Sequence, residues 1–99
     1  MADRKITVLA RIKAKAGMEE RVKRELLALV APSRSEEACL DYDLHQSVDD
    51  KSLFMFYENW TSKGALDKHL EMPYLDAFDE KVEGMLAEPV EISLWEMIS

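Results

Sequence analysis

The chain has 99 residues, 47% of them hydrophobic, which fits one compact domain over residues 1–99. Thirteen Lys and Arg against twenty Asp and Glu leave a net charge of −7, which repels polyanions, so nucleic acid is not expected as a partner. No apolar run approaches the ~20 residues of a membrane-spanning helix, so no membrane association is expected either.

The N-terminal residues and the single cysteine predict a cytoplasmic protein. Residues 1–5 are mostly polar and lead directly into an alternating segment, without the apolar stretch of a secretory signal. Cys39 is the only cysteine, so no disulfide can form within the chain. Because no His stands beside it in the sequence, we expect Cys39 to be a small buried hydrophobic residue.

The first third of the chain predicts a strand followed by a helix. Residues 6–14 carry apolar side chains at every second position, which is typical of a strand, and Gly17 ends this segment. From Met18 to Val30 apolar residues recur at helical spacing. One helix is therefore expected here, ending near residues 32–35.

The middle of the chain predicts a β-hairpin. Residues 39–47 alternate again, with Leu40, Tyr42 and Leu44 on one face, and an Asp-Asp turn follows at 49–50. The next extended run, residues 53–60, is apolar on both faces for most of its length. This pattern indicates a central strand that is covered above and below.

The last third predicts two short helical segments and a strand. Residues 61–62 are hydroxyl residues that can cap a short helix carrying residues 65–70. Pro73 begins a second helical segment that ends near Gly84. Residues 90–98 alternate as a final strand.

The resulting order, β-α-β-β-α-β, predicts an α+β fold of the ferredoxin-like type. Four antiparallel strands then form one sheet, and both helical segments pack on one face of it. Because residues 53–60 are apolar on both faces, the other face must meet something besides the helices. A second protomer is expected there, as a homodimer of two facing sheets with an apolar cavity in the space between them.

A carboxylate and an aromatic wall are expected on one face of the central strand. Phe54, Phe56, Glu58 and Trp60 alternate and so share that face. His69 follows on the next helix, where Glu58 could be its hydrogen-bond partner and so make it a general base. The alternative is structural: Trp60 in the core, Glu58 in a salt bridge and His69 pinning helix to sheet.

Two residues of the hairpin complete the candidate site. Tyr42 and His45 could line the cavity as substrate-binding residues. Packing with a tethered hydroxyl is the alternative for Tyr42, as for Tyr74, and a solvated pair with Asp43 is the alternative for His45. The two His residues show no metal-ligand spacing, so no metal site is expected.

Three segments resemble the antibiotic-biosynthesis monooxygenase domain: residues 6–17, residues 38–46, and residues 57–62 continuing to 65–70. The most specific element is Glu58-x-Trp60 followed nine positions later by His69. The resemblance covers nearly the whole chain and implies a dimeric α/β barrel. It also implies oxidation of quinols, anthrones or related phenolics by dioxygen without flavin, haem or metal.

Comparison with branches of the same superfamily narrows this expectation. Its haem-degrading branch carries Asn, Trp and His where an ungapped count places Ala10, His69 and Asp79, so haem degradation is not expected. The anthrone-oxidising branch has substrate-facing residues that align with Phe56, Trp60 and His45. Of these only the Trp is retained, so the exact anthrone pocket of that branch is not expected.

The sequence thus predicts a cofactor-independent monooxygenase acting on a small quinol-like or phenolic substrate. His69, Glu58 and Trp60 are the expected catalytic residues, and the expected substrate-binding residues are Phe54, Phe56, Tyr42 and His45. Two alternatives remain open. One is an isomerase acting on a phosphorylated multi-carbonyl compound, which would need cations such as Arg11, Lys13 or Lys68. The other is a dimer that binds an aromatic ligand without turnover.

Overall fold

A computed structural model describes residues 4–99. Residues 1–3 lie outside the described part, so the cytoplasmic location, which rests partly on them, stays a prediction. The sheet has four antiparallel strands in the order β2-β3-β1-β4. These strands are β1 (Ile6–Lys13), β2 (Cys39–Gln46), β3 (Leu53–Trp60) and β4 (Glu91–Trp95).

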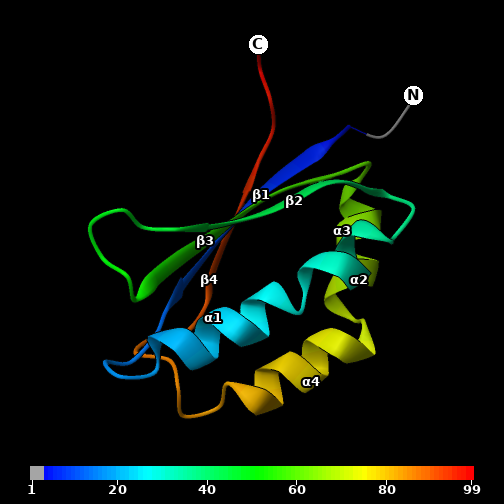
Figure 1. Ribbon diagram of the computed structural model, residues 1–99. Coiled ribbons are helices and arrows are strands. Elements are labelled where there is room, and N and C mark those ends of the chain that lie inside the picture. The colour runs from blue at the N-terminus through cyan, green and yellow to red at the C-terminus, as the bar shows by residue number, and fades with distance from the viewer. Residues whose placement is uncertain (1–3) are drawn as a thin grey trace.

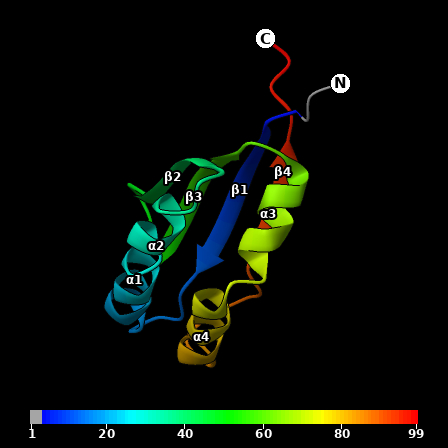
Figure 2. The ribbon, with the colours of Figure 1, turned by 90° about the vertical axis from the view of Figure 1, so that its right-hand side faces the viewer.

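The helices lie on one face of this sheet, as Figures 1 and 2 show from two directions. They are α1 (Glu19–Leu27), α2 (Val30–Arg34), α3 (Lys63–Leu70) and α4 (Pro73–Lys81). The predicted ferredoxin-like α+β fold is therefore confirmed. Within residues 4–99, no helix has the length and apolar character needed to cross a bilayer.

The single helix predicted from Met18 onward is divided into α1 and α2. A tight turn separates them, in which the Leu29 N–H donates to the Leu26 carbonyl three residues earlier. Pro32 explains the break, because it has no N–H to offer the carbonyl of Ala28 and its ring crowds that position. The predicted end of the helical region, between residues 32 and 35, is confirmed.

The final strand is shorter than the predicted 90–98. It ends at Trp95, which pairs with Thr7 of β1. Strand β1 itself begins only one residue before Thr7, at Ile6. Residues 96–99 therefore find almost no backbone on β1 to which they could bond, and alternation alone cannot extend a strand beyond its partner.

The strand register decides which side chains face the helices. Ala10 lies opposite Phe56, and Val8 lies opposite Glu58, so these four side chains share a face. Burial shows which face of the first strand meets the helices. The buried residues on the helix side of β1 and β3 are Val8, Ala10, Ile12, Phe54, Phe56, Glu58 and Trp60.

A bulge in β2 changes one predicted position. The register shifts between Cys39 and Asp41, so Leu40 leaves the face of Tyr42 and is 51% exposed. Cys39 itself is half-buried rather than buried. Burial, together with the charge of Glu58, raises the pKa of the Cys39 thiol to about 11, so it stays protonated and unreactive at neutral pH.

Candidate functional site

A cavity of about 290 Å³ lies between the helix side of the sheet and the helices. Strand residues such as Ala10 and Phe56 form its floor, and Leu26 of α1 and Phe78 of α4 form its walls. The sequence placed the cavity between the sheets of two protomers. The cavity in the single chain lies on the opposite side of the sheet, because the helices on that face leave space above β1 and β3.

The cavity carries polar groups at its buried end, and three of the four residues at its rim are apolar. Tyr42, Glu58 and His69 line it and are at most 5% exposed. Residues that line it and are exposed, and so form the rim, are Leu70, Asp79, Val90 and Ile92. Titratable groups at the closed end of an apolar hollow are the usual layout of a small-molecule site.

Glu58 is held by the indole of Trp60. The Trp60 Nε1–H donates to Glu58 Oε1 at 2.9 Å, and the Trp60 side chain is fully buried. Burial raises the pKa of Glu58 to about 7; the hydrogen bond from Trp60 opposes this shift and the nearby charge of Glu36 adds to it. Glu58 is therefore partly protonated near neutral pH and can both donate and accept a proton there.

His69 reaches the cavity from α3. This helix starts where the Ser62 hydroxyl accepts the Ala65 N–H at 3.1 Å, and two turns later His69 faces the sheet. Its Nδ1 lies 2.7 Å from Oε2 of Glu36, a residue between α2 and β2. The prediction that Glu58 is the partner of His69 is therefore wrong, because Glu58 binds Trp60 and Glu36 takes its place.

Tyr74 of α4 completes this polar cluster. Its hydroxyl donates to the same Oε2 atom of Glu36 and lies 3.4 Å from Ser33 Oγ. Burial, followed by the hydrogen bond to Glu36, raises the pKa of Tyr74 to about 12, so this hydroxyl remains a donor across the physiological range. A tethered hydroxyl at Tyr74 is confirmed.

The second ring nitrogen of His69 faces the cavity. Among the described residues, no buried side-chain nitrogen or oxygen lacks a hydrogen-bond partner. Nε2 of His69 has no partner within residues 4–99, so it must be accessible, and the accessible space beside it is the cavity that His69 lines. His69 therefore presents one ring nitrogen to Glu36 and the other to a ligand.

The remaining predicted residues divide between the cavity, the core and the far face. Tyr42 and Phe56 line the cavity with ring centroids 4.6 Å apart. Trp60 does not line it but packs behind His69, with ring centroids 4.3 Å apart. Phe54 is buried in the core and is not part of the lining. His45 pairs with Met55 on the opposite face, exposed and away from this cavity.

Two acidic residues at this site were not predicted for it. Glu36 lies 33 positions before His69 in a polar loop, and no spacing pattern in the sequence connects them. Asp79 follows the predicted helical apolar stripe one turn after Leu75, so its position at the cavity rim could have been read from helical periodicity. Burial, with the charge of Asp76, raises the pKa of Asp79.

The donor set of the cavity is acidic and aromatic. Among the described residues that line it, Glu58 and Asp79 are the acids and no Lys or Arg is present. Within residues 4–99, no three His, Cys, Asp or Glu side chains are grouped so that they could hold a metal ion. The chemistry that the lining itself offers is proton transfer and stacking against aromatic rings.

Known proteins are similar to this chain in sequence and in fold. The sequence model of the antibiotic biosynthesis monooxygenase family matches residues 5–88 of this chain. An uncharacterized protein of Synechocystis is 36% identical over 97% of the chain, and the chain spans 65% of the length of that relative. The Mycobacterium tuberculosis protein named "Putative monooxygenase Rv0793" is 30% identical over 90% of this chain and 87% of its own.

A solved structure agrees with these sequence relatives. The crystal structure of a Pseudomonas aeruginosa protein superposes with a TM-score of 0.93 and 37% identity, covering 100% of this chain and 99% of that one. The family match spans most of the chain, and the fold of the Pseudomonas protein agrees over its whole length. The chain therefore belongs to the antibiotic biosynthesis monooxygenase family.

Proposed function

We propose that this protein is a cofactor-independent monooxygenase that oxidises a small quinol-like or phenolic substrate with dioxygen. The observation that carries the proposal is the open Nε2 of His69 at the buried end of a cavity that the rings of Tyr42 and Phe56 also line. A base beside aromatic rings suits a planar molecule with an acidic hydroxyl. Membership of a family whose relatives are named as monooxygenases supports the reaction class.

The proposed reaction begins with proton transfer. Nε2 of His69 accepts the hydroxyl proton of the substrate, and the resulting electron-rich anion passes one electron to dioxygen. The substrate radical and superoxide then combine into a carbon–oxygen bond. The peroxide takes back the proton and loses water, so one oxygen atom of dioxygen enters the product and the other leaves as water. The substrate supplies the electrons.

Glu58 and Trp60 have distinct parts in this proposal. Glu58 lines the cavity and, in its protonated form, can donate a hydrogen bond to the oxygen that becomes anionic. Trp60 is a positioning residue, because it holds Glu58 through its indole N–H and packs against the ring of His69. The apolar side chains of the lining limit the contact of the anion with water.

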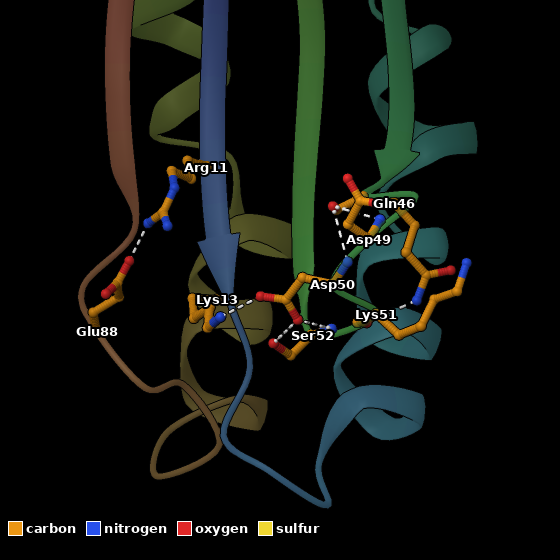
Figure 3. A network of polar contacts seen from close by, with 9 residues as sticks. Arg11, Lys13, Gln46, Asp49, Asp50, Lys51, Ser52 and Glu88 are labelled. Atoms are coloured by element: carbon orange, nitrogen blue, oxygen red, sulfur yellow. Dashed lines mark hydrogen bonds and ion pairs between the residues drawn. The ribbon is translucent and has the colours of Figure 1, made fainter.

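The position of the cations argues against a phosphorylated substrate. Arg11 points to Glu88 and Lys13 to Asp50 at one end of the sheet, as Figure 3 shows. Lys68 lines a separate outer groove. None of these three lines the cavity, where a phosphate would instead meet carboxylates. An isomerase of phosphorylated compounds is therefore not favoured by this site.

The direct test is oxygen consumption by metal-free, flavin-free protein with a panel of quinols and anthrones. We expect uptake above the autoxidation of each substrate, with one labelled oxygen atom from dioxygen in the product. Boiled protein controls for surface effects. If every substrate binds without uptake, the protein is a binding module and the proposed reaction is wrong; phosphorylated ketones then form the next panel.

We also propose that the 99 residues form one domain that pairs with a second copy through the outer face of the sheet. Tyr57 and Trp95 on that face are 39% and 54% exposed, and Leu9 and Met55 lie beside them half-buried. Packing these side chains against a partner removes apolar surface from water.

Light scattering at micromolar concentration is expected to give the mass of two chains. Introducing a charge with Tyr57→Asp should shift this mass toward that of one chain, because an unpaired carboxylate would be buried at the interface. The matched variant Val48→Asp, on an 86% exposed hairpin position, should leave the mass unchanged. Wild-type protein with the mass of one chain would contradict the proposed pairing.

A further inference from the structure

Glu36 separates two hollows of the molecule. On its inner side, Oε2 contacts Nδ1 of His69, whose ring lines the cavity. On its outer side, Glu36 lines a groove of about 440 Å³ that also includes Ser62, Lys68 and Met72. The Glu36 side chain is 14% exposed, whereas that of His69 is 2% exposed. The carboxylate can therefore be reached from outside without passing through the cavity.

We propose that Glu36, held by Tyr74, is the positioning residue that makes His69 a base. It fixes the ring proton on Nδ1, so that Nε2 presents its lone pair to the cavity. It also stabilises the imidazolium that forms when Nε2 takes a proton. This inference rests on the proposed function, since it assigns Glu36 a role through His69.

The hydrogen-bond chemistry of the cluster supports this assignment. A carboxylate only accepts, so the 2.7 Å contact requires a proton on Nδ1, and a neutral imidazole then has an acceptor at Nε2. Tyr74 donates to the same oxygen and therefore orients the carboxylate. The Glu36 carboxylate lies directly against the imidazole, so it can form a charge-assisted hydrogen bond to the ring when Nε2 takes the substrate proton.

Other acidic groups near His69 are already engaged or distant. Glu58, the carboxylate that the sequence suggested for this role, accepts the indole N–H of Trp60. Asp79 lies at the exposed cavity rim. Glu36 is thus the carboxylate that the described structure places on the ring of His69.

Nitrogen NMR of histidine-labelled protein tests the tautomer independently of activity. At a pH where both imidazoles are neutral, we expect the His69 proton on Nδ1, with exposed His45 as the internal reference. Glu36→Gln should keep this tautomer, because the amide oxygen accepts the same bond, and Glu36→Ala should lose it. A proton on Nε2 of His69 in the wild-type protein would overturn the inference.

Kinetics and chemical rescue test the role in turnover. We expect Glu36→Ala to lower kcat by about 10- to 100-fold with little change in KM, since a charge-assisted hydrogen bond is lost away from the substrate. Glu36→Gln should lower kcat by a smaller factor than Glu36→Ala does, because an amide holds the ring in place without neutralising the imidazolium. Glu71→Ala, an exposed carboxylate at the end of α3, is the matched control and should behave as wild type.

Formate offers the sharpest comparison. In Glu36→Ala the outer groove should extend to Nδ1 of His69, so added formate is expected to restore kcat and the Nδ1 tautomer together. Formate should do neither in His69→Ala. Unchanged kcat in both Glu36 variants, or rescue of kcat without the tautomer, would contradict the proposed role. If the wild-type protein shows no oxygen uptake, the proposed function fails, and the NMR comparison alone decides whether Glu36 positions His69.

Discussion

Replacing His69 with alanine is expected to lower kcat for oxygen consumption by roughly 10²–10⁴, the usual contribution of a positioned general base. The expectation follows from geometry: Nδ1 is bound to Glu36, and Nε2 faces the cavity beside Tyr42 and Phe56. Without this nitrogen the substrate hydroxyl must lose its proton to water, which the buried end of the cavity excludes. The measurement is steady-state oxygen uptake with a substrate that the wild-type protein turns over.

Two further variants separate catalysis from folding. His69→Gln keeps a polar side chain against Glu36 but lacks a base, so its kcat should fall by about as much as that of His69→Ala. His45→Ala makes the same change on the far face of the sheet and should retain most of the wild-type rate. Circular dichroism must show the wild-type fold for each variant. A folded His69→Gln protein with wild-type kcat would rule out this base.

Replacing Glu58 with glutamine is expected to stabilise the protein at alkaline pH and to change little at acidic pH. Burial raises the pKa of Glu58 from its ordinary value of 4.5 to about 7, so the folded state binds a proton more tightly than the unfolded state does. The contribution of protonated Glu58 to the free energy of unfolding is fully present below pH 4.5 and is lost as the pH rises toward 7. The total is on the order of 3 kcal/mol, at 1.36 kcal/mol for each pKa unit.

The glutamine side chain preserves the contact with Trp60, because its amide oxygen can still accept the indole N–H. The free energy of urea unfolding, measured from pH 4 to pH 9, should show Glu58→Gln gaining on wild type through the window between 4.5 and 7 and then running parallel to it. Glu91→Gln removes the same charge from an exposed position of β4 and should show no such window. A constant difference across the range would mean that the fold does not shift the pKa of Glu58 from its value in the unfolded chain.

Local patterns in the sequence determined the elements and their order. Alternation marked three of the strands, because the two faces of a strand differ in burial, and a run that is apolar on both faces marked the central strand at residues 53–60. Helical spacing marked the segments that cover one face. These patterns also placed Phe56, Glu58 and Trp60 on one face and His69 on the following helix, where the structure has them. Two predicted boundaries were wrong. The predicted helix is divided because of Pro32, and the last strand ends at Trp95 because β1 offers no further backbone partner.

The partners of the site residues are set only by tertiary structure. The sequence suggested a hydrogen bond between Glu58 and His69. In the structure Glu58 instead accepts a hydrogen bond from Trp60, and His69 contacts Glu36, which lies 33 positions earlier in the chain. The sequence placed the cavity on the outer side of the sheet, whereas the cavity of the single chain lies on the helix side. Residues 53–60 are apolar on both faces, so no local pattern distinguishes the two sides. Helix packing decides this, by burying one face and leaving a space beside His69 that no local pattern encodes.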